Sequence, residues 1–461
     1  MHTKNLLFIT WDGPQTSYME GLFMPIFQEI AKQGEYQFHV IQFTWADDKK
    51  IAHTKAAADK MGITYAAWPV LRKPNVSIGS LLTVLTAAGK IKKYIRENNI
   101  HIVMPRSTFP AMIVNQINSS FASHTFFPFR GLRGPSFFPF RGLRGASFFP
   151  FRGLRGSAFF PFRGLRGGKV PFRGFRGVKV PFRGFRGKLI FDADGLPIEE
   201  RIDFAGLKKK SFQYKLMKSA ETKMLKSADA VITRSQKAID IHIAHIGESY
   251  RSKFSVVFNG RDRNVFAYQP NLREEVRQEL GLKDELMFVY AGSLGPQYCL
   301  NEMLEIFQAY ATKHLTKFLI LTGNTEFAEQ NIPSELKAHV ILKSVPSEKV
   351  SFYLNGGDVA FGLRKPTFSM QGVAPIKLGE YLLCGLPVIA SKGIGDTEKI
   401  LENFEECYLY DHSVGLRTQI DQIKNFVEKA IFANRNKIAQ KAQHYFSLEA
   451  AAESYLNAIK N

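Results

Sequence analysis

Residues 374–390 combine a cation and a carboxylate with the boundaries of a short helix. Lys377 and Glu380 are three residues apart, so both project from one face of that helix. Gly385 ends the helix, and an apolar strand follows at 388–390. If this helix begins at a cleft, its lysine and N-terminus can bind a diphosphate, while the glutamate can accept hydrogen bonds from ribose hydroxyls. A capped surface helix with an i,i+3 ion pair is the alternative that spacing alone leaves open.

A turn rich in small residues, 292–295, is a second candidate phosphate site. It follows a predicted strand and precedes a helix, and small residues let backbone N–H groups approach a phosphate closely. An ordinary strand-to-helix turn is the alternative interpretation.

Charged and small residues also follow strands predicted in the first half of the chain, where a ligand-binding cleft is expected. Each could instead be structural, because an arginine can pair with a local carboxylate and an aspartate can cap a turn. The turn after the first strand lacks a Gly-x-Gly-x-x-Gly fingerprint, which counts against a nicotinamide cofactor. The catalytic candidates are Arg106 and Asp194, together with Lys377, and the acceptor-side candidates are Gly13, Ser17, Glu199 and Glu200.

Short apolar runs alternate with helical patterns along the whole chain. The predicted strands are 5–10, 37–43, 63–67, 100–104, 188–191, 230–233 and 254–258, then 286–290, 318–322, 340–342, 359–361, 388–390 and 407–410. This alternation predicts an α/β protein with two doubly wound, Rossmann-like domains that face each other across a cleft. We assign an acceptor domain to 1–258, a donor domain to 259–440 and a C-terminal helix that packs back on the first domain to 441–461.

Five segments, in order, resemble motifs of one enzyme family. Pro-x-Lys-x-x-Glu-Tyr-Leu-x-x-Gly-x-Pro-Val, from Pro375, resembles the donor-site signature of GT4-type glycosyltransferases, which have the GT-B fold. The other similar segments are Asp192-Ala193-Asp194-Gly195 with Glu199-Glu200-Arg201, which is typical of a capsule and lipopolysaccharide branch, then 228–235, Asn259-Gly260-Arg261-Asp262 with Phe266, and 290–295. The resemblance implies a hexosyltransferase that uses a nucleotide-diphospho-sugar and retains the configuration of the sugar carbon.

The chain departs from the family pattern at three positions of the expected donor and acceptor sites. Ser293 replaces the usual arginine of the glycine turn, and no lysine follows nearby. We therefore expect the positive charge to come from Lys377 first, and from Arg364 or Lys365 second. Gly372 replaces the first glutamate of Glu-x7-Glu, and Asp194 replaces the arginine of Asp-x-Arg-Gly. No Asp-x-Asp motif is evident in the donor domain, so we expect no cofactor and no essential metal. The candidate donor-binding residues are Gly292, Ser293, Gly295, Arg364, Lys377 and Glu380.

The formal net charge of +21 comes mostly from one repetitive segment. Residues 126–187 contain twelve Arg, two Lys and no acidic residue, and contribute +14 of that charge. Phe-Phe-Pro-Phe-Arg-Gly-Leu-Arg-Gly occurs there four times and Lys-Val-Pro-Phe-Arg-Gly-Phe-Arg-Gly twice. Proline and glycine in every unit break helix and strand, so we expect a disordered, irregular insert over 122–187. A neutral expansion is favoured over contact with anionic lipid, and nucleic acid is the least favoured partner.

The remaining composition suits two domains in a reducing compartment. The chain has 461 residues and three scattered cysteines without metal-ligand spacing. No apolar segment approaches the ~18–20 residues of a membrane span. We therefore expect a cytoplasmic protein, with peripheral contact to the inner face of the plasma membrane as an option. The helix predicted over 207–226 carries seven Lys and one Glu, which fits either a solvated face or docking to an anionic membrane.

The leading hypothesis is a glycosyltransferase of surface polysaccharide or lipid-glycan assembly, with a nucleotide-sugar donor and a glycan or lipid-linked acceptor. A nucleotide-sugar 2-epimerase has the same two-domain architecture but needs no acceptor. A non-catalytic nucleotide-sugar-binding protein is the third hypothesis, because the departures from the family pattern could mark a degenerate site.

Overall fold

The computed structural model describes the chain except residues 1–2, 15, 120–186 and 313. Except for its last residue, the predicted disordered insert, 122–187, lies outside the described part. The helix α4 ends at Ser119 and the strand β5 begins at Lys188, so the insert joins a helix to the amino end of a strand, as predicted.

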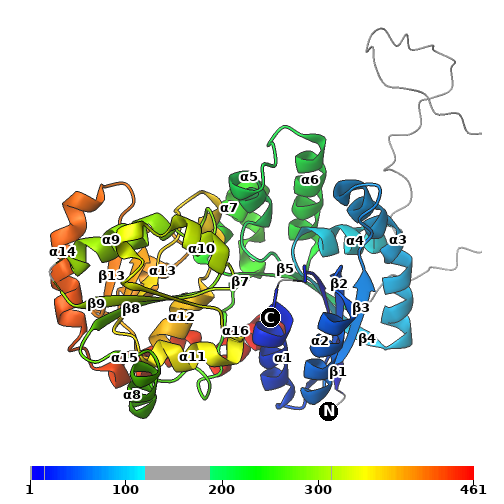
Figure 1. Ribbon diagram of the computed structural model, residues 1–461. Helices are drawn as coiled ribbons and strands as arrows, with labels where there is room; N and C mark the ends of the chain where they lie inside the picture. Colours follow the sequence, from blue (N-terminus) through cyan, green and yellow to red (C-terminus); the bar gives the residue numbers. More distant parts are fainter. Residues whose placement is uncertain (1–2, 15, 120–186, 313) are drawn as a thin grey trace, which may run out of the picture. The chain divides into compact units, whose positions relative to one another are not determined.

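The described chain contains two parallel sheets (Figure 1). The first has the order β3-β2-β1-β4-β5-β6-β7, and the second has the order β10-β9-β8-β11-β12-β13. Each order is doubly wound, because the chain starts in the middle of the sheet, builds one half and then the other. The strands of the first sheet are β1 Lys4–Trp11, β2 Tyr36–Thr44, β3 Thr64–Pro69, β4 Ile100–Pro105, β5 Lys188–Asp192, β6 Ala230–Thr233 and β7 Phe254–Val256. Those of the second are β8 Leu286–Ala291, β9 Thr316–Leu321, β10 Val340–Lys343, β11 Val359–Gly362, β12 Val388–Ser391 and β13 Cys407–Tyr410.

Helices connect successive strands and cover the sheets. In the first half they are α1 Met24–Ala31, α2 Asp48–Lys60, α3 Val76–Glu97, α4 Thr108–Ser119, α5 Pro197–Phe204, α6 Phe212–Ser227 and α7 Gln236–Ile246. In the second half they are α8 Pro270–Glu279, α9 Leu300–Ala311, α10 Thr325–Asn331, α11 Ser347–Asn355, α12 Ile376–Leu383, α13 Thr397–Leu401, α14 Leu416–Ala430, α15 Arg435–Phe446 and α16 Leu448–Lys460. Short turns are η1 Met19–Phe23 (π-helical), and η2 Glu248–Lys253, η3 Ser334–Leu336 and η4 Ser369–Gly372 (3-10). Among the described residues, no helix combines the length and apolar character needed to span a bilayer.

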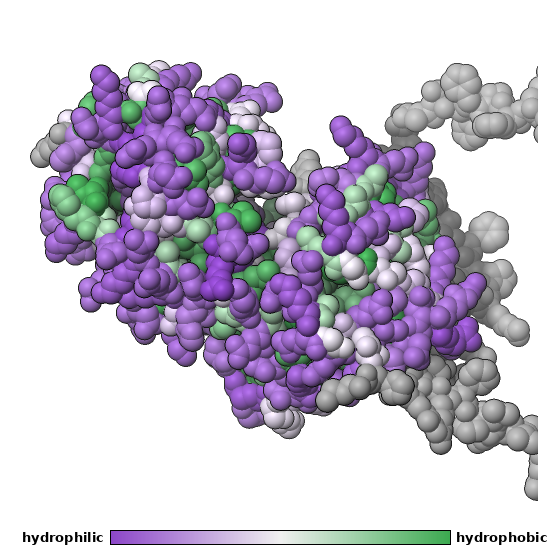
Figure 2. All heavy atoms as spheres, turned by 90° about the horizontal axis from the view of Figure 1, so that it is seen from below, coloured by the Kyte–Doolittle hydropathy of each residue, from purple (hydrophilic) through white to green (hydrophobic). Residues whose placement is uncertain are grey.

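Aromatic and aliphatic side chains fill the space between sheets and helices. In the first sheet, β1 and β2 pack against η1, α1 and α2, and the rings of Phe8, Phe27 and Phe38 are fully buried there. The second sheet has a core on each face, one beneath α8, α11, α12 and α15 and the other beneath α9, α10 and α14. The face drawn in Figure 2 is largely hydrophilic, with hydrophobic side chains in small groups, as expected for helices whose apolar stripes point inward.

The last two helices belong to different cores. The helix α15 packs on α12, whereas α16 packs on α1 and contributes Tyr455 and Ile459 to the core of the first sheet. Ser447 separates them, and its hydroxyl accepts a hydrogen bond from Ala450 N at 3.1 Å, which caps α16. Residues 441–446 of the predicted C-terminal helix therefore belong to α15, and the return to the first sheet begins at Ser447. The sequence analysis did not predict α15.

Side-chain caps determine where two helices begin, and one of these starts differs from the prediction. The helix α3 begins at Val76, because the Asn75 side chain accepts from Ile78 N at 2.9 Å. The helix α6 begins only at Phe212, because the Ser211 hydroxyl accepts from Tyr214 N at 3.1 Å.

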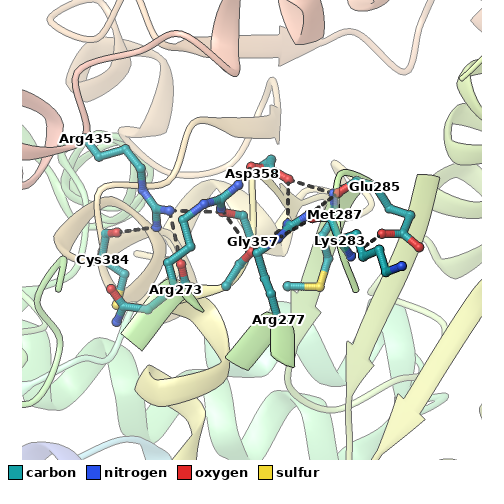
Figure 3. Close-up of polar contacts among 11 residues, drawn as sticks. Arg273, Arg277, Lys283, Glu285, Met287, Gly357, Asp358, Cys384 and Arg435 are labelled. Atoms are coloured by element: carbon teal, nitrogen blue, oxygen red, sulfur yellow. Dashed lines mark hydrogen bonds and ion pairs between the residues drawn. The ribbon is translucent and has the colours of Figure 1, made fainter. Parts of the chain in front are cut away.

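A polar network holds α8 and α15 against the amino end of the second sheet (Figure 3). The Asp358 carboxylate, just before β11, pairs with Arg273 at 2.6 Å and Arg277 at 3.5 Å and accepts from Met287 N at 2.8 Å. Arg435, in the first turn of α15, donates to backbone carbonyls of three residues around it. These contacts lie at the edge opposite the strand carboxyl ends, so the network is structural.

Candidate functional site

A cavity of about 510 Å³ lies at the carboxyl ends of the strands of both sheets. Predicted site residues account for many of its walls, and they are Arg106, Asp194, Glu200, Gly292, Ser293, Arg364, Lys377 and Glu380. Residues that were not predicted as part of the site also line it, and they include Tyr18, Arg234, Asn259, Arg261 and Tyr298. The backbone at 372–374, where a sugar pocket was expected, lines it as well. The cavity thus combines cationic, anionic and aromatic groups from both domains.

Lys377 lies in the first turn of α12 and is enclosed by aromatic rings. Its Nζ donates to the Tyr290 hydroxyl at 2.6 Å and lies 4.4 Å and 4.2 Å from the ring centres of Tyr290 and Tyr298. Its alkyl chain crosses Gly292 so closely that a Cβ at that position would collide with it. Burial, and then the nearby Arg364, lower the pKa of Lys377 well below its usual 10.5. A buried ammonium group next to the glycine turn is prepared to bind an anion.

Glu380 lies one turn later in α12 and pairs with Arg261. The Arg261 Nε donates to Glu380 Oε1 at 2.7 Å, and the two side chains are 17% and 11% exposed. A second nitrogen of the same guanidinium donates to the Gly21 carbonyl of the first domain. The alternative of a surface helix with a Lys377–Glu380 ion pair is therefore wrong, because Glu380 is buried, Lys377 is half-buried, and each has a different partner.

Two arginines and three aspartates form a buried charge cluster at the ends of β1, β4, β5 and β6. Arg106 contacts Asp194 at 2.6 Å and Asp12 at 3.7 Å, while Arg234 contacts Asp192 at 2.7 Å. Burial raises the pKa of both Asp12 and Asp192. Burial opposes the charge of Arg106, but the surrounding carboxylates outweigh it and raise its pKa. The Asp194 side chain, at 25% exposed, is the most accessible carboxylate of this cluster.

The turn that carries Asp194 lies against the second domain. Asp194 and Gly195 have φ values of 55° and 83°, so the chain turns sharply through the left-handed region. This turn meets Gly372, where an added Cβ would lie 2.8 Å from Leu196 N. The missing glutamate of the family motif thus has a physical reason, because the first domain leaves no room for a side chain at position 372.

Further hydrogen bonds hold the segment after η4. The Ser235 hydroxyl donates to the Gln371 carbonyl at 2.7 Å, and Asn259 Nδ2 donates to the Ala374 carbonyl at 2.9 Å. The residues before α12 are therefore held by Ser235 of the first domain and by Asn259 at the start of the second, and α12 with them.

Other predicted residues lie outside the described cavity lining. Glu199 pairs with Lys218 at 2.8 Å beneath α6, in a structural contact. Gly13 lies under the Trp45 ring, and Ser17 accepts a backbone hydrogen bond from Gly21. Gly295 accepts one from Tyr298 N in the turn that precedes α9. Glu200, in contrast, lines the cavity, and burial raises its pKa.

Two of the unassigned cavity residues had a signal in the sequence. Arg261 stands where the family pattern has valine, and Arg234 follows a predicted strand within a segment that resembles the family. A charged residue at an apolar motif position, or at a strand end, indicates a local partner. Tyr18 and Tyr298 had no such signal, because an aromatic residue in a loop is common.

The comparisons with known proteins bear on the fold. No family model and no curated protein matches the sequence. Among solved structures, Anabaena Alr3699/HepE in complex with UDP-glucose is 13% identical, with a TM-score of 0.60 and 99% of each chain covered. The lipopolysaccharide outer core galactosyltransferase WaaB is 12% identical, with a TM-score of 0.59 and 99% of each chain covered. A putative UDP-N-acetylglucosamine 2-epimerase from Listeria monocytogenes is 11% identical, with a TM-score of 0.52 over 100% of this chain and 96% of the other. The chain therefore has the predicted GT-B fold of two doubly wound, Rossmann-like domains that face each other across a cleft.

Proposed function

We propose that this chain is a glycosyltransferase that moves a hexose from a nucleotide-diphospho-sugar to a glycan or lipid-linked acceptor. The observation that carries the proposal is the position of Lys377, in the first turn of α12 and packed over Gly292 in a cavity between two Rossmann-like domains. Similarity of fold to a protein in complex with UDP-glucose and to a galactosyltransferase supports a UDP-sugar as the donor.

The donor site follows from the charges around the glycine turn. The backbone N–H group of Ser293, with Lys377 and Arg364, would bind the diphosphate. Gly292 N already donates to the Leu321 carbonyl at 2.8 Å, so this glycine contributes only the room that the Lys377 side chain occupies. Glu380 would accept hydrogen bonds from the ribose, with its carboxylate already oriented by Arg261. The loss of the family's usual arginine in the glycine turn is thereby offset by cations from other segments.

Catalysis would depend on stabilising the diphosphate as it leaves. In a site that excludes water, fixed dipoles and cations can stabilise the negative charge that develops in the transition state. This stabilisation is usually the largest contribution to the rate enhancement. Asp194, held by Arg106, would face the acceptor hydroxyl from the first domain. We propose retention of configuration from the GT4 resemblance and a reaction without an essential metal, because the residues assigned to the diphosphate are cationic.

The first domain offers a surface for an acceptor held in a membrane. Ile78, Leu82 and Leu85 follow one stripe of α3 and are 46%, 41% and 46% exposed. The helices α3 and α6 both pack on α4, and the α6 segment carries the lysines predicted over 207–226. Exposed aliphatic groups near basic ones suit an anionic lipid surface. We therefore propose a cytoplasmic enzyme of surface polysaccharide or lipid-glycan assembly that contacts the inner face of the plasma membrane.

The two alternatives have less support. The solved structure of the putative 2-epimerase matches this chain with a lower TM-score, 0.52, than the UDP-glucose complex does, 0.60. A non-catalytic binding protein would be favoured by a dismantled diphosphate site, yet Lys377, Arg364 and Glu380 all line the cavity.

The test compares Lys377→Ala with Lys399→Ala, which removes an exposed lysine of the same domain. Each purified protein is incubated with a panel of UDP-sugars and glycan acceptors, and its fold is checked by circular dichroism. We expect turnover by the wild type and by Lys399→Ala, and loss of turnover with the fold retained in Lys377→Ala. Near-normal turnover in Lys377→Ala would refute the site, epimer formed without acceptor would favour the epimerase, and UDP binding without turnover by the wild type would favour the binding protein.

A further inference from the structure

Three side chains with metal-ligating atoms converge at the start of the helix α9. The thiol of Cys299, the carboxylate of Glu302 and the imidazole of His412 have ligand atoms that all lie within 4.8 Å of one another. They come from separate segments, because Cys299 and Glu302 begin α9 whereas His412 follows β13. None of the three lines the described cavity wall.

The backbone and a neighbouring hydroxyl hold these groups in place. Cys299 has a left-handed φ of 49°, which is uncommon for a residue with a side chain. His412 Nε2 shares a hydrogen bond of 2.8 Å with the Ser391 hydroxyl, which itself accepts from Arg364 N at 2.8 Å. That bond engages Nε2 and leaves Nδ1 as the other imidazole nitrogen. Histidines that bind metals commonly have such a partner on their second nitrogen, since it fixes the ring and its tautomer.

We infer that Cys299, Glu302 and His412 form a zinc site. Zinc takes thiolate, imidazole and carboxylate ligands, and three protein ligands leave a fourth tetrahedral position for water. A thiolate disfavours magnesium and calcium, which select oxygen ligands. The three groups are buried or half-buried, so they differ from the exposed acidic clusters that are common on protein surfaces.

A thiol, an imidazole and a carboxylate could also form a nucleophilic triad, but the environment argues against it. Cys299 is 7% exposed and does not line the described cavity, so its thiol has no access to a substrate there. His412 Nε2 shares its hydrogen bond with the Ser391 hydroxyl and not with the thiol, as a base for the thiol would. A bound dication would stabilise the thiolate directly through its charge.

Zinc at this position would restrain the loop 292–299, which joins β8 to α9. Gly292, Ser293 and Tyr298 line the donor cavity and shortly precede Cys299 in the chain. Arg364, which donates to Ser391, lines it as well. A metal that ties α9 to the segment after β13 would restrict the motion of this loop. The role is structural, so it agrees with transfer chemistry that needs no metal at the diphosphate.

The test uses the full chain stripped with a chelator and then dialysed. Calorimetric titration with zinc chloride, and the absorption of the cobalt(II) form, are compared for the wild type, Cys299→Ser and Cys407→Ser. Cys407 lies in β13, so its variant matches the loss of one thiol in the same domain. We expect one zinc ion per wild-type chain and an unchanged zinc affinity in Cys407→Ser. The zinc affinity of Cys299→Ser should be lower by about 10-fold to 100-fold or more. After cobalt(II) is added, the thiolate-to-cobalt absorption band should be present in the wild type and in Cys407→Ser. It should be absent from Cys299→Ser.

His412→Ala provides a second measurement if Cys299→Ser does not fold. Zinc should raise the melting temperature of the wild type, because a ligand that binds only the native state stabilises it, and should leave that of His412→Ala unchanged. The proposal would be overturned if Cys299→Ser or His412→Ala bound zinc as tightly as the wild type. It would also be overturned if the wild type showed no stoichiometric zinc binding. None of these readouts depends on glycosyl transfer, so the zinc site and the proposed function can fail separately.

Discussion

The contact between Gly372 and the first domain gives a sharp prediction for Gly372→Ala. An added Cβ would lie 2.8 Å from Leu196 N, 2.9 Å from Leu196 Cγ and 3.0 Å from Gly195 C. Ordinary contacts begin at 3.4 Å, so the facing chain has to retreat by about 0.6 Å. Since two of the three atoms are backbone, rotation of one side chain cannot relieve the clash. The two domains must move apart instead.

The cost can be estimated from the energies of overpacking. Forcing an extra carbon into a close contact costs about 1–3 kcal/mol. Such a difference corresponds to about 5-fold to 150-fold in an equilibrium constant. The penalty applies to the arrangement in which both domains line the cavity, and not to the fold of either domain. Donor affinity and turnover should therefore fall by this factor, while the free energy of unfolding changes little.

The matched control is Gly323→Ala. Gly323 follows β9 in the same domain, has no positive φ, and an added Cβ there would meet nothing within 4 Å. UDP affinity is measured by calorimetry, turnover with the active UDP-sugar, and stability by urea unfolding, for both variants and the wild type. Equal UDP affinity and turnover in Gly372→Ala and Gly323→Ala would show that this contact does not limit the working arrangement, and the reasoning would be refuted.

Three further predictions concern charge, stability and the insert. Because burial lowers the pKa of Lys377, the folded state releases this proton at a lower pH than the unfolded chain does. The contribution of Lys377 to the free energy of unfolding should therefore increase as pH rises from the lowered pKa towards 10.5. UDP affinity should fall over the same range, since the neutral amine no longer attracts the diphosphate, and calorimetry on Lys377→Met should show no such fall. Asp358→Ala should cost about 3 kcal/mol in urea unfolding, because it strips a buried carboxylate, 11% exposed, from Arg277 and its neighbours. The exposed Asp284→Ala should stay within about 0.5 kcal/mol of the wild type, and a similar loss in both variants would contradict the network's role. Deleting 122–187 should leave UDP affinity and turnover on a soluble acceptor unchanged and weaken only salt-sensitive binding to anionic vesicles, whereas lost UDP affinity in a folded variant would show that the insert reaches the cavity.

Much of the fold could be predicted because short, fully buried strands have a simple signature. Residues 388–390 and 407–410 are apolar runs between turn residues, and both became strands close to the predicted bounds. Helix ends were less accurate, since one capping side chain such as Asn75 or Ser211 decides where the first turn forms. The amphipathic pattern of α15 was missed, because its length is short and its surface is mostly polar.

The candidate site divides along a similar line. Lys377 and Glu380 could be placed together because one helix carries both, and their spacing fixes their common face. The partner of Glu380 could not, because Arg261 is 119 residues away in sequence and reaches it only once the whole second domain has folded. Glu199 was assigned to the acceptor side because Glu199-Glu200-Arg201 resembles a motif of the family. Its salt bridge to Lys218 depends on how α6 packs, which periodicity does not encode.

The location of α16 in the first core has a consequence for the order of events during synthesis. Tyr455 and Ile459 complete the core that β1 and α1 begin, so the core of the first domain is incomplete until α16 has been synthesised. The ribosome makes ~200 residues after the last strand of the first sheet before Tyr455 is added, which takes about 10–40 s at common elongation rates. During that interval a groove along α1 lacks its final helix, while the second domain can already fold. A chain that stops before Tyr455 would therefore leave the first domain's core incomplete while the second domain is intact, and chaperone binding should favour such chains.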